Sequence, residues 1–449
     1  MSVPRIPQAP AMSLQPETQL GATLQPGRRP GLFAVHSLRQ RTLVLHASGG
    51  VGPLAPRRIL IGTRAGRLAV SAVICAALLV ACSKSQPTSA PSRSTSMPSQ
   101  SSTAADPLTA AIANVLNSYT TLDNVRAIIV DVNGRPRFEH YYSSTAAESR
   151  SSYSVTKSVT STLVGIAISE GRLRLDERLS QMLPRYAAEM TPSLARVTLR
   201  QLLTHTAGFT DTWNIQLGEL VTSPDWVRFI LKHQDYAPFH DFHYSDYGAH
   251  LLSPILVQAT GQSVLAYARA KLFDPLGIVT RPASEPPFDE AHAPDYDRAG
   301  FAWPVDPQGF HTTAFFLKLR PRDMATFGQL FLQNGQWNGR QVVPTAWVRQ
   351  ATTGQAGKSF SDYGGSAGSA FNPTNYGYFW WVEPTSGVTA YYALGFGGQL
   401  IEVVPDLHLL IVVSSNVDET RPGAPVVGPG EVQHLVDAIV PIIKTHPTR

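Results

Sequence analysis

The chain has 449 residues, of which 43% are apolar and 15% are charged, and its formal net charge is +5 with a pI near 9.2. This length allows one large domain or two to three ordinary ones, and the composition excludes a disordered chain and a coiled coil. The positive charge lies at the N-terminus: residues 1–81 hold nine Arg and one Glu, whereas the remainder holds 28 basic and 31 acidic residues. The basic pI therefore gives no indication of a nucleic-acid-binding surface on the body of the protein.

An export signal is expected at residues 57–81. Four Arg between Arg57 and Arg67 precede the apolar run Leu68–Ala81, which is typical of a secretory signal and shorter than the roughly 20 residues of a membrane span. The run ends in Leu79-Val80-Ala81-Cys82, which resembles a lipobox, in which the Cys is acylated and becomes the new N-terminus. We therefore expect a protein anchored by a lipid on Cys82 to the outer face of the bacterial cytoplasmic membrane. An ordinary signal peptide, in which Cys82 has no role, is the alternative.

The segments on either side of this signal are not expected to form a core. Residues 1–56 make an unusual Pro- and Arg-containing forerunner of a signal peptide, so we expect translation to start downstream, near Val51 or Leu54. Residues 82–105 are read as a solvated tether after the lipidated Cys, because 15 of the 23 residues from 83 to 105 are Ser, Thr or Pro. The remaining residues, 106–449, contain no Cys and hence no disulfide or thiolate metal site.

Two hairpins are predicted near the ends of this body. The apolar run Val125–Val132, the turn pair Asn133-Gly134 and the segment Arg135–Tyr142 predict the first hairpin. Gln399–Val404 and Leu407–Ser414, joined at Pro405-Asp406, predict the second. Helices are expected at the following segments: Leu108–Leu116, Ser154–Glu170, Thr198–Leu203, Ala249–Ala259, Pro321–Gln333 and about Glu431–Lys444.

Strands at both ends with helices between them predict an α/β (α+β) fold: an antiparallel sheet flanked by helices, with an inserted helical lobe. We expect an α/β lobe at about 106–150 and 300–449 and a helical lobe at about 151–299. A cleft between the lobes is the default site.

The only Ser-x-x-Lys sequence in the chain is Ser154-Val155-Thr156-Lys157, at the expected start of a helix. Residues three apart share one helix face, so Ser154 and Lys157 are expected to be neighbours. The helix N-terminus favours a developing oxyanion at Ser154, and a Lys that is driven toward its neutral form there can accept the Ser proton. The pair therefore predicts nucleophilic catalysis, although such a short match also arises by chance.

Two further segments could complete such a site. Tyr244 stands at an expected loop-to-helix junction, from which its hydroxyl could relay protons between the Ser and a leaving group. Taken alone, it would more often be a packed aromatic residue. Gly395-Phe396-Gly397-Gly398 opens the second hairpin, where glycines permit a close backbone approach and the Phe396 N–H could enter an oxyanion hole. A Gly-rich turn without a catalytic part is the alternative.

These motifs together resemble the serine β-lactamase-like superfamily. The resemblance covers roughly residues 106–445 and is greatest to the branch of esterases and 6-aminohexanoate-dimer hydrolases, which is akin to class C β-lactamases and D-Ala-D-Ala carboxypeptidases. It rests on the following segments: Ser154–Lys157, Leu202–Gly208, Tyr244–Asp246, Pro321–Leu330, Trp337–Gly339, Val343-Pro344, Tyr376–Trp381 and Gly395–Gly398.

The resemblance implies that Ser154 is the acyl-forming nucleophile, Lys157 its activating base and Tyr244 the proton relay. It also implies that the N–H groups of Ser154 and Phe396 bind the oxyanion. The sequence departs from the family's motifs at two places. Asp246 replaces the Asn of Tyr-x-Asn, and a carboxylate there would favour a charged Lys157 and weaken the base. Ala393-Leu394-Gly395 replaces Lys-Thr-Gly and removes the cation that meets a β-lactam carboxylate, so weak or absent β-lactamase activity is expected.

Other candidate motifs are given structural interpretations. Gly364–Gly368 fits a Gly-x-Ser-x-Gly elbow, and Asp406 and His434 follow in order, but no apolar strand precedes it. His205 is expected to belong to a structural turn. Three histidines, His240, His243 and His250, are expected to be solvated or packed rather than to bind a metal. Three tryptophans are expected to line either an acyl pocket or the core: Trp303, Trp380 and Trp381.

The sequence thus predicts an exported serine hydrolase that forms an acyl-enzyme with a small ester or amide. It needs no metal or other cofactor and no nucleic-acid partner. The alternative is a weakly catalytic or non-catalytic envelope protein that uses the same fold to bind peptidoglycan-like or lipid ligands, and Asp246 is the residue that keeps this alternative open.

Overall fold

The computed structural model describes residues 106–118, 124–211, 216–232, 239–356, 375–385, 387–417 and 427–446. The expected signal peptide, Cys82, the tether and the Gly364–Gly368 motif lie outside these residues. None of the described helices has the length and apolar character needed to cross a membrane.

A seven-stranded antiparallel sheet combines two strands from the first part of the described chain with five from its last part, in the order β2-β1-β11-β10-β9-β8-β7. Its strands are β1 (Val125–Val132), β2 (Arg135–Tyr141), β7 (Asn375–Tyr376), β8 (Trp381–Thr385), β9 (Val388–Gly395), β10 (Gln399–Val404) and β11 (Leu409–Ser415). Short ribbons are formed by β3 (Arg150–Ser151) with β4 (Lys318–Leu319) and by β5 (Gln336–Trp337) with β6 (Arg340–Gln341). The antiparallel sheet, its flanking helices and the inserted helical lobe confirm the expected fold class.

Both predicted hairpins are present. Asn133 and Gly134 have φ values of 54° and 69°, the left-handed pair that a tight two-residue turn requires. The second hairpin turns through Pro405–Leu407, and β11 begins at Leu409, two residues later than expected. The delay arises because His408 has a φ of 46°, which is incompatible with a strand, and its carbonyl accepts a bond from the Asn133 N–H.

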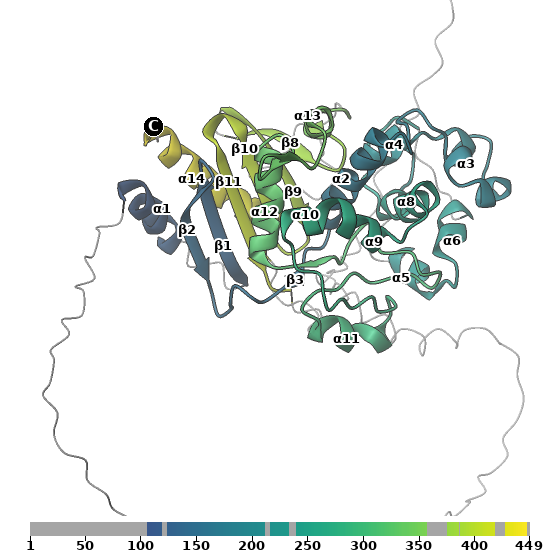
Figure 1. Cartoon of the computed structure of the whole chain (residues 1–449), viewed down its shortest axis with the longest axis horizontal. Coiled ribbons are helices and arrows are strands. Elements are labelled where there is room, and N and C mark those ends of the chain that lie inside the picture. The colour runs from purple at the N-terminus through teal and green to yellow at the C-terminus, as the bar shows by residue number, and fades with distance from the viewer. Residues whose placement is uncertain are drawn as a thin grey trace, which may run out of the picture. The chain divides into compact units, whose positions relative to one another are not determined.

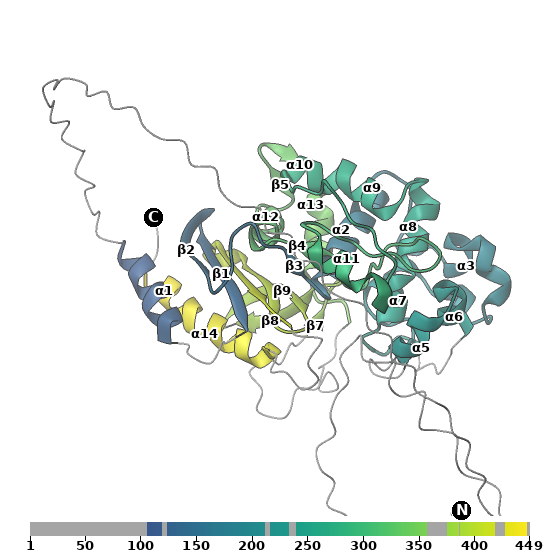
Figure 2. The ribbon, with the colours of Figure 1, turned by 90° about the horizontal axis from the view of Figure 1, so that it is seen from below.

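Helices cover both faces of the sheet, which explains why β1, β10 and β11 are almost continuously buried. On one face, α1 (Pro107–Ser118) packs against α14 (Pro429–Thr445). On the other, α12 (Pro321–Leu332) and α2 (Val155–Ser169) contact the central strands (Figure 1; Figure 2). Gly328 permits the close approach of α12, since a Cβ there would lie 2.4 Å from a methyl group of Leu410.

Most of the remaining helices lie on the side of α2 that faces away from the sheet (Figure 1). They are α3 (Leu179–Met182), α4 (Leu199–Leu203), α5 (Gln216–Thr222), α6 (Trp226–Lys232), α7 (Asp246–His250), α8 (Leu252–Thr260), α9 (Val264–Ala268), α10 (Asp274–Leu276), α11 (Ala293–Arg298) and α13 (Thr345–Ala351). The single helix expected at Ala249–Ala259 is therefore wrong in detail, because the segment forms α7 and α8. Pro254 has no N–H for the His250 carbonyl, which instead accepts from the Thr313 hydroxyl at 3.2 Å.

Candidate active site

Ser154 lies at the start of α2, in a turn whose neighbouring residues are fixed by hydrogen bonds. The Thr156 hydroxyl donates to the Tyr153 carbonyl at 2.6 Å and accepts from the Leu317 N–H at 3.1 Å. The Ser152 hydroxyl donates to the Leu317 carbonyl at 2.7 Å. Tyr153 adopts a φ of 45°, a conformation that is costly for a bulky residue and is found mainly where the surroundings impose it. The half-buried Ser154 side chain is therefore presented by a fixed turn.

Lys157 lies next to Ser154, as the three-residue spacing predicts. Its Nζ is 3.2 Å from the Ser154 Oγ and 2.8 Å from the Ala314 carbonyl oxygen, to which it donates. Only 1% of the Lys157 side chain is exposed. The Ala314 contact joins residues that are 157 positions apart and could not be found from local spacing.

Asp246 and Tyr244 approach the same ammonium group from the start of α7. The Asp246 carboxylate forms an ion pair with Lys157, and its side chain is 5% exposed. The Tyr244 ring has its centroid 4.7 Å from the Lys157 Nζ and stacks on Trp381 at 5.6 Å. The structure thus brings Ser154, Lys157, Tyr244 and Asp246 together.

Asp211 is a fifth polar residue of this site, and no motif in the sequence indicated it. Its Oδ2 accepts from the Asp246 N–H at 2.8 Å, and its Oδ1 accepts from the Ser245 hydroxyl. Burial and the nearby Asp246 charge raise the pKa of Asp211 to about 7. Asp211 follows the Leu202–Gly208 motif by three residues, but its contacts reach 34 to 36 positions along the chain, so no local pattern reveals them.

His205 packs behind Tyr244, with the two ring centroids 4.5 Å apart. Its Nδ1 accepts from the Ser245 N–H at 3.2 Å, and no hydrogen-bond partner for Nε2 is found among the described residues. Burial, followed by the charge of Lys157, holds the pKa of His205 well below its usual value. A neutral ring that contacts Tyr244 and the Ser245 backbone has the structural role that the sequence suggested.

The Gly395–Gly398 segment contacts the turn that carries Ser154. A Cβ at Gly395 would lie 2.3 Å from the Ser152 carbonyl oxygen, so the two backbones touch. The next residue, Phe396, contacts the Tyr153 ring at 5.7 Å and leaves 42% of its surface exposed. The Ser154 N–H makes no hydrogen bond with the described part of the chain. Phe396 and Ser154 therefore lie on adjoining backbone segments, as an oxyanion hole requires.

Most of the other candidate residues are buried. Trp303, Trp380 and Trp381 are core residues, and Trp381 also contacts Tyr244. His240 is exposed and His243 is half-buried. His250 is buried and its Nε2 lies 3.0 Å from Asp306 Oδ2. Within the residues that the structure describes, no cluster of three His, Cys, Asp or Glu side chains could hold a metal ion.

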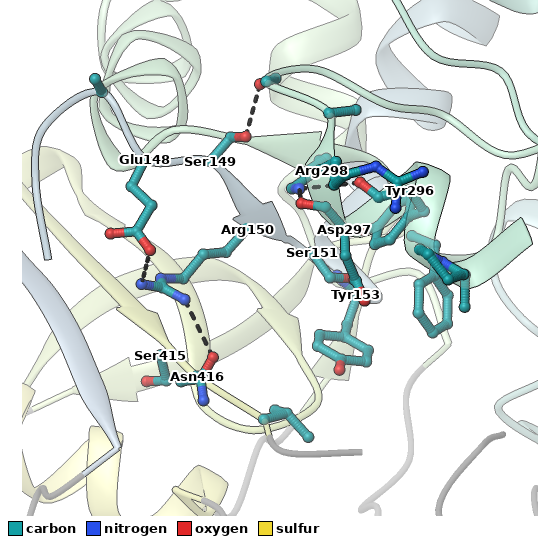
Figure 3. A pocket seen from close by; sticks show the side chains of 18 of the residues that line it. Glu148, Ser149, Arg150, Ser151, Tyr153, Tyr296, Asp297, Arg298, Ser415 and Asn416 are labelled. Carbon is teal, nitrogen blue, oxygen red and sulfur yellow. Dashed lines mark hydrogen bonds and ion pairs between the residues drawn. The ribbon is translucent and has the colours of Figure 1, made fainter. Parts of the chain in front are cut away.

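A cavity of about 790 Å³ lies beside the turn that carries Ser154 (Figure 3). Tyr153 lines this cavity, but Ser154 and Lys157 do not. Its cations have protein partners. Arg150 contacts Glu148 at 2.6 Å and Asn416 at 3.1 Å, and Lys318 donates to the Tyr296 and Asp297 carbonyls at the end of α11. The cavity is therefore lined by cations that already have protein partners.

Residues 126–431 match the beta-lactamase family, and the chain belongs to this family of serine hydrolases. An uncharacterised protein of Alkalihalophilus pseudofirmus is 24% identical over 287 residues, which are 59% of this chain and 72% of that protein.

Solved structures show the same fold at low identity. A candidate 6-aminohexanoate-dimer hydrolase of Bacillus anthracis superposes with a TM-score of 0.54 at 19% identity, over 72% of this chain and 80% of that one. D-amino acid amidase of Ochrobactrum anthropi superposes with a TM-score of 0.56 at 16% identity, over 76% of this chain and all of that one. The fold and the serine hydrolase superfamily expected from the motifs are thus confirmed.

Proposed function

We propose that this protein cleaves small neutral esters or amides through an acyl-enzyme formed on Ser154. The observation that carries the proposal is the 3.2 Å contact between the Ser154 Oγ and the Lys157 Nζ at the first turn of α2. Ser154 Oγ would attack the carbonyl carbon while Lys157 takes the hydroxyl proton. The N–H groups of Ser154 and Phe396 would bind the oxyanion, and Tyr244 would return the proton to the leaving group.

The preference for a neutral substrate follows from β9. This strand carries Ala393 and half-buried Leu394 before Gly395, so it offers no ammonium group to a substrate carboxylate. The relatives of similar fold include one enzyme named as a D-amino acid amidase and one candidate 6-aminohexanoate-dimer hydrolase, which supports an amide among the possible substrates. Export and lipid anchoring at Cys82 are part of the proposal, and the mass of the mature chain recovered from membranes tests them.

A fluorophosphonate probe tests the catalytic assignment. The wild-type protein should gain the mass of one probe molecule, and Ser154→Ala should gain none. Ser169→Ala is the matched control, because this exposed Ser lies at the other end of α2 and should label like wild type. Absence of labelling in the wild type, or equal labelling of Ser154→Ala, would instead support the envelope-binding alternative.

The substrate class is tested separately with p-nitrophenyl esters of short acids, nitrocefin and a D-Ala-D-Ala peptide. We expect turnover of short-acyl esters and little hydrolysis of nitrocefin. Fast nitrocefin hydrolysis would contradict the argument from Ala393 and Leu394.

A further inference from the structure

Asp211 organises the segment from which Tyr244 and Asp246 reach Lys157. Its side chain accepts hydrogen bonds from the Ser245 hydroxyl, from the Asp246 N–H at 2.8 Å and from the Tyr247 N–H at 3.4 Å. The Ser245 hydroxyl in turn accepts from the Gly248 N–H at 3.0 Å. These bonds fix the first turn of α7 and hence the direction in which Asp246 points.

The same contacts place a second carboxylate beside the ion pair of Asp246 and Lys157. This matters because an ammonium group has no lone pair, so Lys157 must lose a proton before it can accept one from Ser154. Within the described residues, Asp246 is the carboxylate that pairs with the Lys157 ammonium. It is therefore the nearest group of opposite charge that can accept the Lys157 proton, and its backbone is bonded to Asp211.

The charged and titratable groups around the two carboxylates come from several elements. Among the described residues they are Lys157 from α2, Tyr244 beside it, Tyr247 from α7 and His205 from the loop before Asp211, with Glu219 from α5 acting on Tyr247. His205 is held neutral by burial, with its pKa well below its usual value. Among the residues that the structure describes, Lys157 is thus the cation that pairs with Asp246, and Asp211 adds a negative charge that forms no ion pair with Lys157.

We propose that Asp211 is a positioning residue for proton transfer: it orients Asp246 toward Lys157, and its charge makes Asp246 a better acceptor for the Lys157 proton. Asp246 takes one proton from the ammonium, which leaves a carboxylic acid and a neutral amine. The amine takes the Ser154 hydroxyl proton as the Oγ bonds to the substrate carbonyl carbon. After Lys157 passes that proton through Tyr244 to the leaving group, Asp246 returns its own proton to Lys157.

The ionisation of Asp211 makes this coupling observable. Burial and the Asp246 charge raise the pKa of Asp211 to about 7, so its charge appears as the pH rises through this value. Two carboxylates in one site repel each other, which favours a proton on one of them. We therefore expect kcat for a p-nitrophenyl ester to rise with pH through an inflection near 7.

Asp211→Asn tests the inference, because the amide oxygen can still accept from the backbone while the charge is lost. A change of one unit in the proton affinity of Asp246 corresponds to a factor of ten, so we expect kcat at pH 8 to fall roughly tenfold and the inflection near 7 to disappear. Asp246→Asn should lower kcat by about a hundredfold or more, the usual contribution of an acid–base group. Adding Asp211→Asn to Asp246→Asn should then change nothing further.

Asp225→Asn is the matched control. Asp225 accepts from the Arg228 N–H at 2.8 Å at the start of α6, a purely structural bond in the same lobe. This variant should keep the wild-type pH profile, and thermal unfolding of every variant establishes that it is folded.

Two outcomes would overturn the inference: an unchanged pH profile in folded Asp211→Asn, or faster turnover in Asp246→Asn, which would mean that Asp246 only holds Lys157 charged. The inference rests on the proposed function, but the two fail differently. Loss of the proposed function requires that Ser154 is not labelled, whereas the Asp211 inference fails while Ser154 labelling and ester turnover persist.

Discussion

Gly395→Ala places a methyl group where the end of β9 packs against the turn that carries Ser154. The added Cβ would lie 2.3 Å from the Ser152 carbonyl oxygen, 3.0 Å from the Cβ of Gln399 and 3.2 Å from the Cβ of Tyr153. The Ser152 carbonyl cannot move alone, because it accepts from the Val155 N–H at 3.1 Å in the first turn of α2. Any relief must therefore separate the end of β9 from the turn that carries Ser154.

The size of the effect follows from these distances. Carbon and oxygen atoms approach to about 3.3 Å in proteins, so the backbones must separate by about 1 Å. Overpacking of this kind costs about 1–3 kcal/mol of folding free energy. Displacing Phe396 from Ser154 would remove one oxyanion donor, which costs roughly 100- to 1,000-fold in kcat.

The assay is the turnover of a short p-nitrophenyl ester, followed together with thermal unfolding. We expect Gly395→Ala to remain folded with a lowered midpoint and to lose most of its kcat. Gly300→Ala is the matched control, because a Cβ there would meet no atom within 4 Å. Wild-type kcat and stability in Gly395→Ala would refute the assignment of β9 to the oxyanion hole.

Two further predictions concern buried charges. Burial raises the pKa of Glu383 on β8 to about 7. Between about pH 4.5 and 7 the folded state therefore keeps a proton that the unfolded state releases. The free energy of unfolding should fall as the pH rises through this range, by at most about 3 kcal/mol. Glu383→Gln should remove this loss in denaturant titrations between pH 4 and 8, and an unchanged pH slope would contradict it. Lys157→Met leaves the Asp246 carboxylate buried without its cation and should cost about 3–5 kcal/mol. Adding Asp246→Asn should restore most of that stability, and equal melting of the single and double variants would show that the pair is not buried in solution.

Features that rest on local chemistry were predictable from the sequence. Asn133-Gly134 turns β1 into β2 because these residues tolerate positive φ, and the apolar run before the turn and the more polar segment after it form the expected strands. Ser154 and Lys157 meet because a helix places residues three apart on one face. The family followed from several such motifs in order. The domain bounds remain predictions.

Features that depend on distant residues were decided only by the tertiary structure. Ser245 caps α7 locally, but Asp211, 35 positions earlier than Asp246, also binds the first N–H groups of this helix, and Lys157 meets the Ala314 carbonyl across 157 positions. Periodicity and spacing report only on neighbours along the chain, since they reflect the geometry of one helix or strand. The sequence by itself therefore determined that Ser154 and Lys157 lie side by side, whereas only the tertiary structure showed that Asp211 binds the backbone of Asp246, because burial brings together charges that no local pattern relates.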